Sequence, residues 1–137
     1  MDGAVVERLR ALHPETTASL LATEAEAAAS TDPSILQLCH HRLAHMLGGE
    51  VSSPATAVDP AKLAALDSWW DSPLFTDAER AHLAFTEQYV LSVGSISDAD
   101  VDKLLEFGSP RQVYDFVNAL FVMDQVQRLE MVARVVL

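Results

Sequence analysis

The sequence predicts an all-α protein that folds as a single domain over residues 1–137. The five glycines and six prolines fall almost entirely between segments whose apolar residues recur at helical spacing. Valine, isoleucine and threonine do not alternate with polar residues over any stretch long enough to suggest a strand. Half of the residues are apolar, which is enough for one compact core, and neither a repeat nor a linker divides the chain.

The first three helices are predicted from their start and stop residues. The first covers Gly3 to Leu12 and the second Glu15 to Ala29, because His13-Pro14 interrupts the helical pattern between them. The second is rich in alanine and glutamate, which favour helix. The third, which we call the central helix, begins at Asp32-Pro33, an N-cap acceptor followed by a proline at the first helical position. It ends at Gly48-Gly49, where glycine allows a left-handed cap.

Residues 50–58 are polar, β-branched and interrupted by proline, so they are predicted to form a loop. A second Asp-Pro signal, Asp59-Pro60, opens a short helix that reaches Trp69-Trp70. The next helix begins at Thr76, which forms a capping box with Glu79, and ends near Gly94.

The last two helices begin at serine. One runs from Ser97 to Gly108, and the other begins at Ser109-Pro110 and continues to the C-terminus. Apolar residues of the last helix form a stripe too wide for one face of a monomeric helix. We therefore expect a homo-oligomer that buries part of this stripe between subunits.

The charge balance excludes several classes of partner. Nine Lys and Arg against twenty Asp and Glu give a formal charge of −11, which opposes binding to nucleic acid or to an anionic membrane surface. No uninterrupted apolar run approaches the roughly 20 residues that span a bilayer.

The N-terminal residues and the single cysteine bear on the compartment of the protein. The first residues, Met1 to Arg8, lack the basic and apolar regions of a secretory signal, so we expect a soluble, cytoplasmic protein. The lone cysteine, Cys39, rules out a disulfide within the chain.

One segment resembles a known family. Residues Trp69 to Phe85 read Trp-Trp-Asp-Ser-Pro-Leu-Phe-Thr-Asp-Ala-Glu-Arg-Ala-His-Leu-Ala-Phe. This block resembles the carboxymuconolactone decarboxylase family and, within it, the AhpD-like alkylhydroperoxidases. The central helix and the residues downstream to Leu137 are similar in pattern, so the resemblance covers roughly 100 residues. It implies an oligomeric, AhpD-like helical bundle.

The peroxidase branch of that family uses residues that this chain lacks. There, a Glu on the central helix precedes a Cys-x-x-Cys motif and a His, and the resemblance implies thiol-based reduction of a peroxide. The matching positions here are Gln37 for the Glu, Gly49 and Ser52 for the cysteines, and Thr56 for the His. All four residues differ, so the usual peroxidase mechanism is not available. Family members on the decarboxylase side also work without a cysteine pair.

The central helix carries the candidate site. At 100° per residue its apolar residues form one stripe, which contains Ile35, Leu36, Cys39, Leu43, Met46 and Leu47. Cys39 is then a buried small hydrophobe. Gln37, His41 and His45 form a polar stripe at i, i+4 and i+8, and His40 lies at the core margin.

Several functions remain open for this stripe. The leading hypothesis is a small-molecule binding or non-redox acid/base site with Gln37, His41 and His45 as candidate residues. Trp69, Trp70 and His40 are weaker ligand-binding candidates, because the tryptophans suit packing at a helix end as well. The plain structural alternative is a solvated or inter-subunit face on a catalytically silent oligomeric scaffold. A third hypothesis is residual peroxidase activity through Cys39.

A metal site is the remaining alternative for the two histidines. We expect no cofactor and no metal. However, imidazoles one helical turn apart can share a transition-metal ion. A third or fourth donor would be required, and the candidates are Glu50, just past the helix, or a residue from a neighbouring subunit.

Overall fold

The computed structural model describes residues 1–137 and contains helices and no β-strand. The predicted all-α fold is therefore confirmed. The α-helices are α1 (Gly3–Leu12), α2 (Pro14–Ala29), α3 (Pro33–Met46), α4 (Pro60–Ala65), α5 (Asp77–Ser92), α6 (Asp98–Leu105) and α7 (Pro110–Val136). Two 3-10 helices, η1 (Leu66–Asp71) and η2 (Val93–Ser95), follow α4 and α5.

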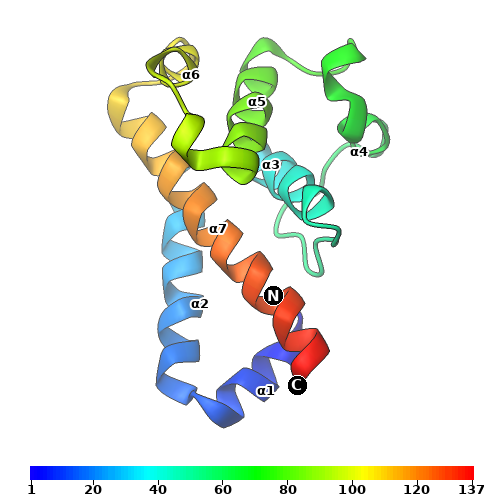
Figure 1. Cartoon of the computed structure of the whole chain (residues 1–137), viewed down its shortest axis with the longest axis vertical. Helices are drawn as coiled ribbons and strands as arrows, with labels where there is room; N and C mark the ends of the chain where they lie inside the picture. The colour runs from blue at the N-terminus through cyan, green and yellow to red at the C-terminus, as the bar shows by residue number, and fades with distance from the viewer.

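The long helix α7 organises the molecule (Figure 1). It packs against α2 and against α3, and α5 packs on α3. The first helix, α1, crosses the ends of α2 and α7, so the two ends of the chain lie near each other (Figure 1). The central helix of the sequence, α3, is thus held between α5 and α7.

The start signals in the sequence act as predicted. The Asp32 carboxylate accepts hydrogen bonds from the backbone N–H of Ser34 (2.9 Å) and of Ile35 (3.0 Å) at the start of α3. Complete capping boxes open α5, at Thr76, and α7, at Ser109. These side chains satisfy amides that have no partner within the helix, which fixes where each helix begins.

Two helix ends differ from the prediction. The central helix ends at Met46, and Gly48 then turns the chain with φ of +79°, a left-handed conformation that glycine adopts without strain. The helix predicted from Pro60 to Trp70 is divided into α4 and η1. Ser68 has non-helical angles (φ −131°, ψ 37°), so a kink separates the two tryptophans from α4.

The core extends around more of α3 than its apolar stripe predicts. Leu36, Cys39 and Leu43 are buried as expected. Leu38 and Ala44 lie outside that stripe and are buried as well, because α3 has neighbours on both sides. Polar residues of α3 therefore face other parts of the protein and do not share one solvent-exposed face.

The apolar stripe of α7 is only partly covered within the chain. Its buried side packs into the core through residues that include Phe116, Leu120 and Met123. Large apolar side chains on the rest of the helix are exposed: Tyr114, Phe121, Leu129, Val132, Val135 and Val136. The structure has no helix with the combination of length and apolar character that crossing a membrane requires.

Candidate functional site

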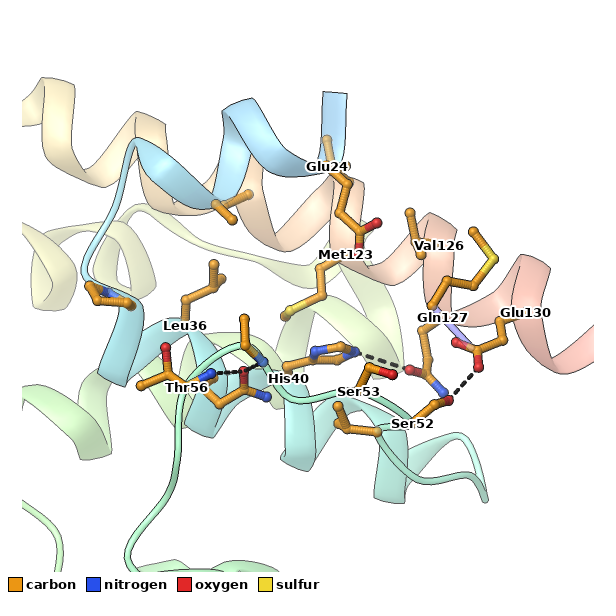
Figure 2. Close-up of a pocket in the computed structure, with 18 residues that line it drawn as sticks. Glu24, Leu36, His40, Ser52, Ser53, Thr56, Met123, Val126, Gln127 and Glu130 are labelled. Atoms are coloured by element: carbon orange, nitrogen blue, oxygen red, sulfur yellow. Dashed lines mark hydrogen bonds between the residues drawn. The ribbon is translucent and has the colours of Figure 1, made fainter. Parts of the chain in front are cut away.

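A cavity of about 120 Å3 lies between α3 and α7, next to the loop of residues 50–58, and α2 contributes to its wall (Figure 2). We call it the α3–α7 cavity. Apolar side chains from α3 and α7, among them Leu36, Val122 and Met123, form much of the wall. Its polar lining consists of Glu24, Gln37, His40, Ser52, Ser53, Thr56, Gln127 and Glu130. A dry cavity of roughly 150 Å3 holds benzene, so this one suits a ligand of a few heavy atoms.

Gln37 connects α3 to the loop. Its side chain is 5% exposed, and its Oε1 accepts hydrogen bonds from the backbone N–H of Ala55 (3.0 Å) and of Thr56 (3.2 Å). Since only an oxygen accepts from two N–H groups, these bonds fix which way the amide points. The Nε2 group is the one buried side-chain nitrogen or oxygen without a hydrogen-bond partner. A buried unpaired donor is costly, which makes Gln37 the first residue to consider for ligand contact.

His40 is the titratable base of the cavity. Its Nε2 donates to Oε1 of Gln127 on α7 at 3.0 Å (Figure 2). Burial lowers the pKa of His40 to about 4, and the hydrogen bond to Gln127 opposes this only in part. The imidazole is therefore neutral at pH 7 with its proton on Nε2, so Nδ1 carries a free lone pair.

Glu130 holds together three segments beside the cavity. The carboxylate is 4% exposed and accepts hydrogen bonds from Ser52 Oγ and from the Asp2 backbone N–H (3.1 Å). Its ion-pair partner is Arg134, at 2.8 Å on the next turn of α7. Nearby, Gln127 Nε2 donates to the backbone oxygen of Glu50 (3.3 Å). The side chains of Gln127 and Glu130, on neighbouring turns of α7, thus bind the loop of residues 50–58 to this helix.

The polar stripe of the central helix is not one site. Gln37 lines the α3–α7 cavity, while His41 and His45 do not. His45 Nδ1 lies 3.0 Å from the Asp67 carboxylate on η1. His41 is half-buried beside His45, and burial together with the charge of that neighbour lowers the pKa of His41. His40, which the sequence assigned to the margin, replaces both histidines at the cavity.

An ion-pair network occupies the opposite side of α3. Arg42 Nε donates to Oε1 of Glu87 (2.8 Å) and Arg42 Nη1 to Oδ1 of Asp67 (2.9 Å). Trp69 Nε1 also donates to Oε1 of Glu87, at 2.7 Å. The interactions of Arg42, Asp67, Trp69 and Glu87 join α3, η1 and α5, so this network stabilises the fold. We call it the Arg42–Glu87 network.

The predicted aromatic and metal-binding residues lie elsewhere. Trp69 is packed through the Arg42–Glu87 network and Trp70 is largely exposed, and neither lines the α3–α7 cavity. Glu50 contacts Gln127 through its backbone oxygen, not its carboxylate. No three side chains of His, Cys, Asp or Glu are arranged to hold a metal ion, so the set of His41, His45 and Glu50 is not assembled in this chain.

Cys39 lies in the core, as the helical pattern predicted. Its side chain is fully buried, and burial raises the pKa of the thiol to about 12. The thiolate is the reactive form of cysteine, so this environment opposes reactivity.

The positions equated with the peroxidase residues come together. Gln37, Ser52 and Thr56, which match the family's Glu, second Cys and His, all line the α3–α7 cavity. Gly49, at the first Cys position, lies just outside. A Cβ placed there would be 3.1 Å from Met131 Sδ and 3.4 Å from Gln127 Nε2.

The residues that the sequence did not single out come mainly from α7. Gln127 and Glu130 are buried although they are polar or charged, and they lie on the face of α7 that carries Met123 and Val126. The signal available in the sequence was that Gln127 and Glu130, at i+4 and i+7 from Met123, are polar residues on an apolar helix face. Glu24, on the alanine-rich helix α2, gave no comparable signal.

Neither a scan against protein-family models nor a search of curated proteins finds a match to this chain.

Proposed function

We propose that this chain is an AhpD-like protein of the carboxymuconolactone decarboxylase family that lacks redox cysteines and binds a small molecule in the α3–α7 cavity. The observation that carries the proposal is the convergence of Gln37, Ser52 and Thr56 on that cavity. Ser52 and Thr56 belong to the loop that follows α3, Thr56 lies 19 positions after Gln37, and all three positions were matched to the family from the sequence alone. Their meeting at one cavity is expected if the family's site survives with different side chains.

The chemistry of the lining favours binding. Gln37 offers an unpaired N–H donor, and His40 offers a neutral acceptor at Nδ1. A general base works best when its pKa lies near the operating pH. With a pKa of about 4, His40 is a weak base at neutral pH and a good hydrogen-bond acceptor. The proposed role of both side chains is therefore to orient a ligand.

Filling the cavity tests this proposal. Ala28 lines the cavity from α2, whereas Ala25 is exposed on the same helix. We expect Ala28→Leu to abolish binding of fragments of up to about six heavy atoms, roughly the size that the volume allows. Ala25→Leu, the matched control, should bind them as the parent chain does. The readout is the side-chain amide NMR signal of Gln37, which a bound fragment shifts.

Two results would contradict a ligand-binding role. One is a fragment screen in which no compound shifts the Gln37 signal. The other is equal binding by Ala28→Leu and Ala25→Leu, which would place any bound fragment outside the cavity.

The proposal includes a homo-oligomer formed through α7. Tyr114, Phe121 and Val132 are exposed on this helix by 51 to 65% of their surface. Monomeric proteins rarely expose apolar patches of this kind without a partner. Light scattering coupled to size-exclusion chromatography should give a mass that is a multiple of 14.9 kDa. A monomer at micromolar concentration would contradict this part.

The exposed apolar face of α7 also favours a second candidate, a catalytically silent scaffold whose oligomer is its function. The two candidates differ in the cavity. A scaffold predicts that Ala28→Leu keeps or raises stability and leaves every other property unchanged. Residual peroxidase activity through Cys39 is a separate outcome, and it predicts peroxide turnover that Cys39→Ser abolishes.

A further inference from the structure

Charge at the α3–α7 cavity is unevenly balanced. Its charged lining groups are the carboxylates of Glu24 and Glu130 and the α-ammonium group of Met1, and neither lysine nor arginine lines it. Glu130 is neutralised locally by Arg134, which also lies 3.5 Å from Asp2. Glu24 is half-buried and takes part in none of the ion pairs of the chain.

A count of nearby charges leaves an excess of negative charge. The carboxylates are those of Glu24, Glu130 and Asp2, and the cations are Arg134 and the α-ammonium group of Met1. Three carboxylates against two cations leave one negative charge in excess. Figure 2 shows the carboxylate of Glu24 directed from α2 towards the side where Met123 and His40 lie.

Neutral acceptors reinforce this preference. His40 presents the lone pair of Nδ1, because its Nε2 proton is donated to Gln127. The hydroxyl groups of Ser52, Ser53 and Thr56 add further acceptors. A ligand group with several N–H donors and a positive charge satisfies these groups together, whereas a carboxylate would add to the excess of negative charge.

We propose that the ligand of the α3–α7 cavity is a small amine, bound as its ammonium form by Glu24 and His40, with its alkyl part against Leu36, Val122 and Met123. This inference rests on the proposed binding function and adds the ligand class to it. The cavity of about 120 Å3 limits the alkyl part to a few carbon atoms. Burial of those carbons supplies the apolar part of the affinity.

Three probes of one shape and different charge test the proposal: n-butylamine, n-butanol and butyrate at pH 7. We expect butylammonium to bind at least tenfold more tightly than butyrate, measured by NMR titration of the Gln37 side-chain amide. Affinity for butylammonium should fall as salt is added, since salt screens the charge on Glu24. Affinity for butanol should not change with salt.

Substitutions of Glu24 with a matched control complete the test. Glu24→Gln should weaken butylammonium binding about tenfold and leave butanol unchanged, and Glu24→Lys should reverse the preference towards butyrate. Glu26 is exposed on the same helix, so Glu26→Gln and Glu26→Lys alter the charge of α2 without altering the cavity. Circular dichroism establishes that each variant is folded.

The possible outcomes distinguish the proposed amine preference from the proposed binding function on which it rests. If butanol and butyrate bind as well as butylammonium, or if the Glu24 and Glu26 variants behave alike, the amine preference is wrong and the binding site stands. If none of the three probes shifts the Gln37 signal in the folded protein, both proposals are wrong.

Discussion

His40 and His45 lie little more than one turn apart on α3, and they meet opposite surroundings. His40 faces α7, where burial keeps it uncharged although its hydrogen bond to the neutral partner Gln127 acts in the opposite direction. His45 faces η1, where its partner is the carboxylate of Asp67, which is 66% exposed. The same side chain is therefore a neutral acceptor next to a cavity on one side, and on the other side a member of a polar network without a cavity. What surrounds a histidine, and not its place in a stripe, decides its chemistry.

The contrast is sharpest in the pH dependence of stability. The pKa of His40 is about 4 in the folded protein, against an ordinary histidine pKa of 6.5 in the unfolded chain. The unfolded chain therefore binds the extra proton between these values, and the free energy of unfolding falls as the pH drops from 6.5 to 4. We expect this histidine to account for about 3 kcal/mol of that loss. Urea unfolding of the parent chain and of His40→Gln at several pH values measures it.

The other side of α3 supplies the control for this prediction. His41→Gln should remove less of the pH dependence, because His41 is less buried than His40. If His40→Gln and His41→Gln change the slope of the unfolding free energy against pH equally, His40 is not buried in the way the structure indicates.

The second prediction concerns the Arg42–Glu87 network. Glu87→Ala removes the acceptor shared by Arg42 and Trp69, so a guanidinium group that is 15% exposed loses its main partner. We expect a loss of about 2 kcal/mol in the free energy of unfolding, because the largely buried guanidinium keeps only its mostly exposed partner Asp67. Asp67→Asn is the comparison: its carboxylate is mostly exposed, so the loss should stay below about 1 kcal/mol. Chemical denaturation that ranks the two in the opposite order would contradict this.

The third prediction concerns the loop next to the cavity. Gln37→Leu removes the acceptor for the backbone N–H groups of residues 55 and 56. It also removes the unpaired Nε2 group, so the net cost should be modest, about 1 kcal/mol. Hydrogen exchange at those two amides should become at least tenfold faster, while exchange within α3 stays the same. Unchanged exchange at both amides would mean that Gln37 does not hold the loop.

The smallest expected effect is at Cys39. Because the thiol is fully buried and its pKa is raised to about 12, a maleimide should not label it in the folded protein at pH 7. Labelling should begin only at denaturant concentrations that unfold the chain. Rapid labelling of the native protein would revive a role for Cys39 in redox chemistry.

Local signals in the sequence predicted most helix starts because the groups that determine them are close together in the chain. The Asp32 cap of α3 and the Thr76–Glu79 box of α5 each depend on residues within three positions. The kink at Ser68 was not predictable in this way, since its non-helical angles belong to a segment that also packs through Trp69. Helix propensity alone favoured a single helix from Pro60 to Trp70.

The candidate site was predicted only in part because it depends on contacts between distant segments. Helical geometry placed Cys39 in the core, but it grouped Gln37 with His41 and His45, whereas the structure places Gln37 alone of these three at the cavity. It could not show that α7 approaches the side of α3 that carries His40, or that Gln127 would fix the proton on that ring. The side of α3 that receives a neighbour is set by the packing of α5 and α7 on both flanks, which no single helix encodes.

The hydrogen bond from Asp2 to Glu130 joins residues 128 positions apart, so it forms between an early and a late part of the newly synthesised chain. Helices α1, α2 and α3 leave the ribosome well before α7, on the order of several seconds at usual rates of synthesis. Until α7 is synthesised, the cavity lacks the wall that this helix supplies. Gln37 can bind the loop by then, but no helix faces it across the cavity. The α3–α7 cavity is therefore completed last, when Glu130 contacts both Asp2 and the loop.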